Sequence, residues 1–184
     1  MSGHNKWSKI KHKKGATDAA RSKVFSKHSR LITMEVKKAG GDKTLSNVLA
    51  AVERAKKDSM PKDAIDRALA KGSGEGAAAL EEVMFEGYGP GGVPLLILAV
   101  TDNNNRTAPL IKHSFSKAGL ELGVPGSAAW AFTKTGDGYV PNTPMELDDE
   151  VGEKLVSFIE NLEEQDDVTD IYTGADTDEP EATE

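Results

Sequence analysis

The sequence has 184 residues, enough for one large domain or two small ones, and it carries a net charge of −7 with 29% charged residues. It contains no cysteine, which excludes disulfide bonds and thiolate zinc sites, and it has no apolar run long enough to predict a transmembrane helix. The N-terminus is basic but lacks the apolar stretch of a secretory signal, so the expected compartment is the cytoplasm.

The first 30 residues hold nine Lys or Arg, three His and one acidic residue. Residues 1–15 show neither a helical nor a strand period, and repulsion among their lysines favours an extended, mobile arm. Lysines on such an arm would contact phosphates, and Trp7 is either a stacking group for a base or an anchor that pins the arm to the helices that follow. The partner that this pattern predicts is a polyanion, with nucleic acid as the first candidate.

Three short helices are predicted after the arm. Thr17 or Asp18 can cap the first, Pro61 suits the first turn of the third, and Gly72 is expected to stop it. Each helix has one apolar side and is too short to be stable alone, so the three should pack as a bundle. Their expected ranges are about 18–39, 45–57 and 61–71.

A composition change follows the third helix. Residues 73–79 (SGEGAAA) have the composition of a linker or exposed loop. Residues 1–71 contain 18 basic and 7 acidic side chains, whereas residues 72–184 contain 5 basic and 23 acidic ones. This division indicates two modules with different roles. The alternatives are that the two halves attract each other or that the acidic half aids solubility.

The second module begins with strand patterns. Residues 80–87 alternate loosely, and residues 93–101 form a continuous apolar run typical of a buried strand. The glycine-rich residues 87–92 match neither a Walker A motif nor a dinucleotide fingerprint, so a tight connection between two strands is favoured over a phosphate cradle. Asp102 to Thr107 (DNNNRT) predicts a turn into a helix over 107–118 with Pro109 in its first turn.

Three further elements complete the pattern: a strand at 127–134, a helix at 151–162 and a strand at 168–173. The order β-β-α-β-α-β predicts an α+β fold, in which an N-terminal three-helix module precedes an α+β sandwich with a mainly antiparallel sheet. A disordered tail is expected from Gly174. The predicted regions are a basic arm at 1–15, a helical bundle at 16–72, a linker at 73–79, an α+β domain at 80–175 and an acidic tail at 176–184.

The sequence gives little support for catalytic or metal-binding residues. His113 near Arg106 and Lys112 is a possible anion contact, although a solvated helix face explains it better. The acids between residues 146 and 170 lack the spacing of a calcium loop and are interpreted as a solvated face. No nucleophile–base set can be assembled from spacing. We therefore predict no enzyme activity, no metal, no cofactor and no small-molecule substrate.

Several segments occur here in one order: the N-terminal run SGHNKWSKIKHKKGATDAARSKVFSKHSR, the Met60-Pro61 break, EGYGPGG, DNNNRT and GSAAWAF. Together they resemble the YebC/PmpR family of probable transcriptional regulatory proteins, which has mitochondrial relatives described as translational activators. The resemblance covers about residues 2–175. It implies a cytoplasmic, non-enzymatic protein with a role in gene expression, either through DNA binding and transcription or through the translating ribosome.

The sequence departs from this family at one place. Members are usually longer, with a third α+β domain inserted before the last helix and strand. Here KTGDGYV passes almost directly into PNTPMELDDEVGEKL, so the inserted domain is expected to be absent, with residues 136–144 as a short bridge. Any contacts which that domain makes in relatives would be missing here.

The leading prediction is a nucleic-acid-binding regulator of gene expression. The residues expected to contact nucleic acid all lie on the arm and the first helix: Lys6, Trp7, Lys9, Lys11, His12, Lys13, Lys14, Arg21, Lys23, Lys27 and Arg30. The acidic remainder would repel duplex DNA wrapped around it, which favours RNA or the ribosome, whereas the family name favours DNA. A protein-interaction adaptor that uses the basic arm is the further alternative, and no membrane partner is expected.

Overall fold

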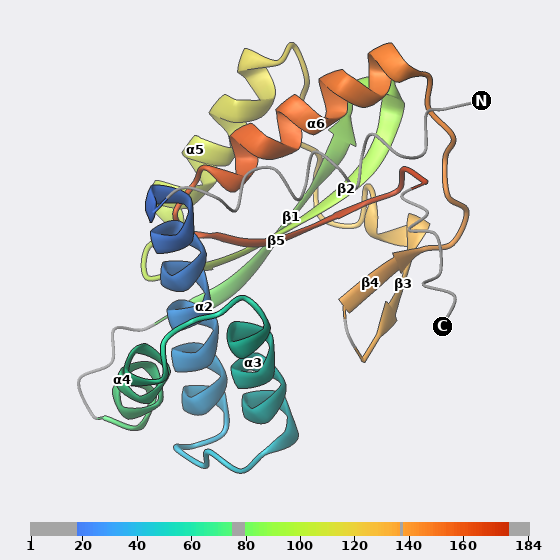
Figure 1. Ribbon diagram of the computed structural model, residues 1–184. Coiled ribbons are helices and arrows are strands. Elements are labelled where there is room, and N and C mark those ends of the chain that lie inside the picture. Colours follow the sequence, from blue (N-terminus) through green and yellow to red (C-terminus); the bar gives the residue numbers. More distant parts are fainter. Residues whose placement is uncertain (1–17, 75–79, 137, 177–184) are drawn as a thin grey trace.

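The computed structural model describes residues 18–74, 80–136 and 138–176, which form a helical module and an α+β module (Figure 1). The predicted fold class is confirmed. The basic arm, most of the expected linker and most of the acidic tail lie outside the described residues. Within the described part of the chain, no helix is long and apolar enough to cross a membrane.

The helical module is organised around its first helix, which packs against the other two. Its elements are α2 (Asp18–Lys38), α3 (Ser46–Lys57) and α4 (Lys62–Ser73). The shared core is formed by Ile32, Val36, Val48, Ala51, Ala55, Met60, Ile65 and Ala68. Gly40 and Gly41 end α2, both with positive φ, and the Gly41 N–H donates to the Val36 carbonyl.

Gly72 has a different role from the predicted stop signal. It is buried inside α4, and the helix continues to Ser73. A Cβ at this position would lie 2.6 Å from Cβ of Val36 and 2.7 Å from the Thr33 carbonyl oxygen. The glycine is therefore required because α4 and α2 approach each other closely here.

The α+β module contains a three-stranded antiparallel sheet in the order β1-β2-β5. Strands β1 (Glu81–Gly89) and β2 (Val93–Thr101) form the predicted hairpin around a 3₁₀ turn, and β5 (Val168–Thr173) pairs with the other side of β2. Helices α5 (Asn104–Lys117) and α6 (Asp149–Glu163) cover one face of this sheet (Figure 1).

The apolar run of β2 is explained by packing on both of its faces. Val93, Leu95 and Ile97 join the core under α5 and α6, whereas Leu96 packs on the opposite face with Ala128 and Phe132. Because both faces of this central strand are buried, its residues are apolar throughout and do not alternate with polar ones.

The predicted strand at 127–134 is wrong over its first half. Residues Ala129–Ala131 form a 3₁₀ turn, and β3 (Phe132–Thr135) starts only after it. Strand β3 pairs with β4 (Gly138–Pro141) in a separate two-stranded sheet instead of joining the main one. The reason is that the buried Glu86 carboxylate accepts hydrogen bonds from the backbone N–H groups of this segment, which therefore forms a turn instead of a strand.

Smaller differences occur at two element ends. Helix α5 starts at Asn104, three residues earlier than predicted, so Pro109 lies inside the helix. The carbonyl of Asn105 loses its helical partner there, but Asn105 is exposed to water. The expected bridge at 136–144 contains β4, and the chain then passes from β4 to α6 without another domain.

The chain also stays ordered beyond the predicted start of the tail at Gly174. The Gly174 N–H donates to the Pro94 carbonyl, and Ala175 is buried and bridges to Met145. The tail expected from Gly174 is therefore wrong for residues 174–176.

Candidate nucleic-acid interface

The predicted nucleic-acid-binding residues divide into two groups. Seven of them lie outside the described residues, namely Lys6, Trp7, Lys9, Lys11, His12, Lys13 and Lys14. The other four lie on α2, namely Arg21, Lys23, Lys27 and Arg30. Arg21 is exposed, whereas the other three contact the α+β module.

Two lysines of α2 contact the C-terminal end of α6. Lys27 Nζ donates to the Glu163 carbonyl at 2.6 Å, and Lys23 Nζ lies 3.4 Å from the Glu164 carbonyl. Unpaired carbonyls give a helix C-terminus a partial negative charge, so cations are favourable here. Burial lowers the pKa of the Lys27 ammonium, against the opposing charge of Glu163.

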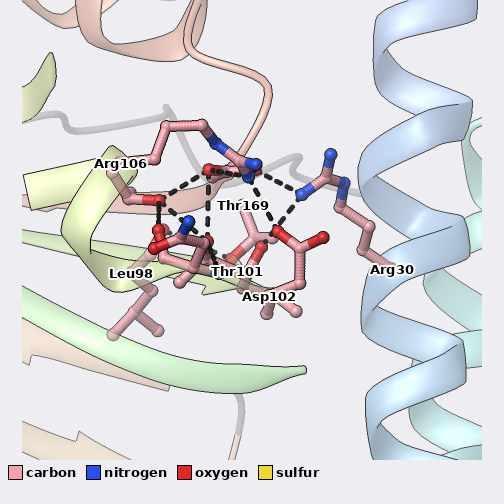
Figure 2. Close-up of polar contacts among 10 residues, drawn as sticks. Arg30, Leu98, Thr101, Asp102, Arg106 and Thr169 are labelled. Carbon is pink, nitrogen blue, oxygen red and sulfur yellow. Dashed lines mark hydrogen bonds and ion pairs between the residues drawn. The ribbon is translucent and has the colours of Figure 1, made fainter. Parts of the chain in front are cut away.

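Arg30 reaches across to a buried carboxylate in the α+β module. Its Nη1 donates to Asp167 Oδ1 and, at 3.2 Å, to the Val100 carbonyl. Asp167 is only 5% exposed. Figure 2 shows Arg30 extending from α2 toward the polar cluster around Thr101, Asp102 and Arg106.

The antiparallel sheet brings the remaining partners of Asp167 together. Asp167 immediately precedes β5, and Thr101 ends β2, its neighbour. Thr107 Oγ1 donates to Asp167 Oδ2 at 2.6 Å, and Arg106 Nη2 donates to the same oxygen at 3.0 Å. Thr101 Oγ1 lies 2.8 Å from Thr107 Oγ1. We call these residues, with Arg30, the Asp167 cluster.

A β-bulge at Thr169 helps to place Asp167. The pairing of β2 with β5 shifts between Leu98 and Ala99, so Thr169 is the extra residue, and its hydroxyl donates to the Leu98 carbonyl at 3.3 Å. Beyond the bulge, the Asp167 carbonyl accepts from the Val100 N–H at 2.8 Å. Bulges of this kind redirect a chain next to a site that must be positioned accurately.

The Asp167 carboxylate is stabilised as an anion. Its burial opposes ionisation, but the Thr107 hydroxyl, the Arg106 guanidinium and the charge of Arg30 outweigh that effect and hold its pKa below the ordinary value. The predicted solvated face of acids is therefore wrong at Asp167. Arg106 also pairs with Asp102 at 2.9 Å, while its side chain stays about half exposed.

Three of the four described candidates thus have partners within the chain. Lys23, Lys27 and Arg30 hold the two modules together, and an exposed pair between Lys38 and Glu82 at 3.4 Å adds to that contact. Attraction between the two halves accounts for part of the charge asymmetry. A phosphate would have to compete with Asp167 for Arg30.

Other cations of the helical module are exposed to solvent. They were not singled out from the sequence, where only the excess of basic residues up to residue 71 pointed to them. They include Lys43, Arg54, Lys57, Lys62, Arg67 and Lys71. These side chains of α3, α4 and the preceding connection, together with Arg21 near the start of α2, can attract anions by charge. We call these seven side chains the basic surface.

A cavity of about 120 Å³ opens where the two modules meet. Its lining residues include two cations, Arg30 and Lys71, and the acidic residue Asp102. The described residues contain no group of three or more His, Asp or Glu side chains that could hold a metal ion. The chemistry that this junction offers is hydrogen bonding and charge pairing.

Comparison with known proteins follows the two modules. Residues 5–75 match the TACO1/YebC protein N-terminal domain, and residues 80–137 match the TACO1/YebC second and third domain. A probable transcriptional regulatory protein of Desulfatibacillum aliphaticivorans is 46% identical over 178 residues, which cover 96% of this chain and 72% of that protein. One from Petrotoga mobilis is 46% identical over 176 residues, covering 94% of this chain and 70% of that protein.

The fold is also found in a solved structure. The crystal structure of a conserved hypothetical protein from Aquifex aeolicus superposes with a TM-score of 0.80 at 28% identity, covering 98% of this chain and 100% of that chain. The arrangement of a helical module on an α+β module is therefore shared with this protein.

Proposed function

The chain belongs to the TACO1/YebC family, and from that premise we propose that it is a regulator of gene expression that acts by binding nucleic acid. Its relatives are named probable transcriptional regulatory proteins, which supports a regulatory role. We propose that it works in the cytoplasm and binds its target without catalysing a reaction.

The observation that carries this proposal is the charge of the helical module. Residues 18–74 contain 13 Lys or Arg and 7 Asp or Glu, and the arm adds five lysines without an acid. Because three cations of α2 are engaged with the α+β module, the proposed phosphate contacts are the arm and the basic surface. Exposed cations of this kind bind phosphates with an affinity that falls steeply with salt.

RNA is the better target on physical grounds. A reading helix must insert an exposed face into the major groove of DNA. Helix α2 has its second half buried between α3 and α4, and its N-terminal half contacts α6 through Lys23 and Lys27. Structured RNA, as on the ribosome, can instead be bound along its phosphates. Transcriptional control through duplex DNA is the alternative function, favoured by the names of the relatives.

Co-sedimentation with ribosomes tests the proposal. The full chain would be centrifuged with ribosomes at about 0.15 M salt, where exposed charges are well screened, with excess duplex DNA as competitor. We expect retention on ribosomes that is lost in a variant with Lys11, Lys13 and Lys14 changed to Ala. A matched control changes Lys112, Lys117 and Lys154, on helices α5 and α6 of the acidic module, to Ala, which should leave retention unchanged.

Other outcomes would decide between the alternatives. Recovery in the DNA-bound fraction would support a transcriptional regulator and contradict the ribosome assignment. Recovery in neither fraction would contradict nucleic-acid binding and favour a protein adaptor.

A further inference from the structure

Trp130 is exposed at the centre of the 3₁₀ turn that precedes β3. Its side chain and backbone are 70% accessible to solvent, although tryptophan is normally well buried. The preceding turn is fixed by Glu86, which is 3% exposed and accepts the N–H groups of Gly126, Ala128 and Ala129 at 2.7–2.8 Å. Burying a carboxylate is costly unless such donors compensate it, so this turn has a well-defined shape.

The indole ring itself is also held in place. Its Nε1–H points toward the Ser127 carbonyl at 2.9 Å and Tyr88 Oη at 3.2 Å, while Asn142 Nδ2 donates to the Trp130 carbonyl at 3.0 Å. The only polar group of the ring is therefore used inside the protein. What Trp130 offers to a partner is an aromatic surface whose orientation is already fixed, so little conformational entropy is lost on binding.

The surroundings of Trp130 differ from the rest of the acidic module. Residues 122–143 include one Lys and one Asp, in a chain of which 29% is charged. Val124 and Val140, within the same stretch, are 71% and 47% exposed. This stretch therefore adds little negative charge of its own, and the ionised Glu86 beneath the turn is compensated by three N–H donors, so repulsion of a polyanion is weaker here than elsewhere on the module.

This neutral region lies on the same side of the sheet as the helical module. Figure 1 shows α5 and α6 on one side of the sheet, and the β3–β4 hairpin together with α2, α3 and α4 on the other. The Tyr139 ring of β4 packs against Tyr172 of β5, with centroids 5.3 Å apart. Burial raises the pKa of Tyr172 to about 12, and the charge of Arg54 on α3 opposes that rise. Arg54, one member of the basic surface, thus acts on the same tyrosine that packs against the hairpin.

We propose that Trp130 is a stacking platform for an unpaired base of single-stranded RNA whose phosphates are held by the basic surface. This inference rests on the proposed function and adds to it a second contact, on the α+β module. A flat aromatic surface without a free hydrogen-bonding group accepts any base, because every base has a π face. An apolar protein surface could also pack on Trp130, but the cation Arg54 acts on Tyr172, which packs on the hairpin that directly follows Trp130, and this favours the nucleic acid.

Fluorescence can isolate this contact, because the chain contains only two tryptophans, Trp7 and Trp130. In a Trp7→Phe background all indole emission comes from Trp130. We expect a single-stranded oligouridylate of about 20 nucleotides to quench this emission, since its bases are free to stack. A duplex RNA of equal length should not quench it, because its bases are already stacked. Anisotropy of the labelled RNA would report binding independently of quenching.

Two variants in the same background complete the test. Trp130→Leu should weaken oligouridylate binding by about fivefold or more, the effect of losing one stacked base, while Trp130→Phe should retain most of it. Both should remain folded because the ring is exposed, which thermal unfolding would verify.

The failures are distinguishable. Binding without quenching, with equal affinity of the Leu variant, would overturn the stacking platform while leaving the proposed function intact. Absence of oligouridylate binding with ribosome retention intact would overturn the platform alone, whereas absence of both would overturn the proposed function as well. If the Leu variant instead lost only the ability to bind another protein, the platform would be a protein-docking site and the inference wrong.

Discussion

Among the residues that the structure describes, two carboxylates are buried, and they are compensated in different ways. Asp167 is held by side chains from different elements, including Arg30 of the other module, whereas Glu86 is held by three backbone N–H groups of one turn. Asp167 joins two modules and occupies a cation that would otherwise be available to phosphate. Glu86 fixes the shape of one turn, and it does so without pairing with any charged side chain that the structure describes in the helical module. A buried carboxylate thus joins two modules at Asp167, and at Glu86 it fixes the turn that carries Trp130.

The largest expected effect is on the Asp167 cluster. Asp167→Ala would leave Arg30 and Arg106 without their buried partner, and losing one side of a buried pair costs about 3–5 kcal/mol. Arg106 is about half exposed and Arg30 partly so, which places the expected loss of unfolding free energy near the lower value, about 3 kcal/mol. Urea unfolding would measure it. Asp166→Ala, at the exposed neighbouring position, is the control and should change stability by less than about 0.5 kcal/mol. Equal effects of both variants would contradict the role of the cluster.

A smaller loss is expected at Glu86. Glu86→Gln keeps the size of the side chain but turns an amide toward backbone N–H donors, and hydrogen bonds to a charged group are worth about 1.5–3 kcal/mol. We expect about 2 kcal/mol by urea unfolding, with a change in Trp130 emission because the turn that presents it is loosened. Glu81→Gln, exposed on the same strand, should alter neither quantity. Stability loss without any spectral change would mean that Glu86 does not hold Trp130.

Acidification should lower the stability contributed by both buried carboxylates, Glu86 and Asp167. Glu86 is buried, which opposes its ionisation, but the three N–H donors outweigh this and lower its pKa below 4.5, as the pKa of Asp167 is lowered below 3.8. A depressed pKa contributes stability that is present above the unfolded value and lost as pH falls through the folded one. Unfolding free energy should therefore decline on acidification below about pH 4.5. The decline should be shallower in Glu86→Gln, and an unchanged slope would contradict an ionised Glu86.

The smallest effects separate the two kinds of cation on α2. Lys27→Ala removes the hydrogen bond from a half-buried ammonium to the end of α6 and should cost about 1 kcal/mol of stability, with little change in RNA affinity. Arg21→Ala, on the exposed side, should do the reverse: stability changes by less than about 0.5 kcal/mol while RNA affinity falls. Urea unfolding and RNA anisotropy on both variants would show whether α2 is divided in this way. Equal loss of affinity in both would mean that Lys27 also contacts phosphate.

Much of the fold was predictable because it depends on local patterns. The helices of the first module, the glycine end of α2 and the β1–β2 hairpin all follow from period and turn residues. The curl before β3 was not predictable in this way. The segment SAAWAF alternates like a strand, but Glu86, about 40 residues earlier, takes its N–H groups away from strand pairing.

The candidate site was less predictable because it depends on long-range pairing. Arg30 and Asp167 are 137 residues apart in the chain, and each alone has the appearance of an ordinary surface charge. One signal existed: the two segments DNNNRT and DDVTDIYT adjoin predicted strands, and antiparallel pairing of those strands would have placed Thr101 beside Asp167. The exposed cations of α3 and α4 could have been found from the predicted apolar sides of these helices, since the opposite sides face solvent.

The central claim is that the arm and the basic surface contact phosphates. Its most direct test is the salt dependence of oligouridylate binding by the full chain and by the variant with Lys11, Lys13 and Lys14 changed to Ala. On a single strand each lost phosphate contact should reduce the slope of log affinity against log salt by about 0.7. We predict weaker binding with a slope reduced by about 2 in the variant if all three lysines engage phosphate. Unchanged affinity and slope would contradict the account.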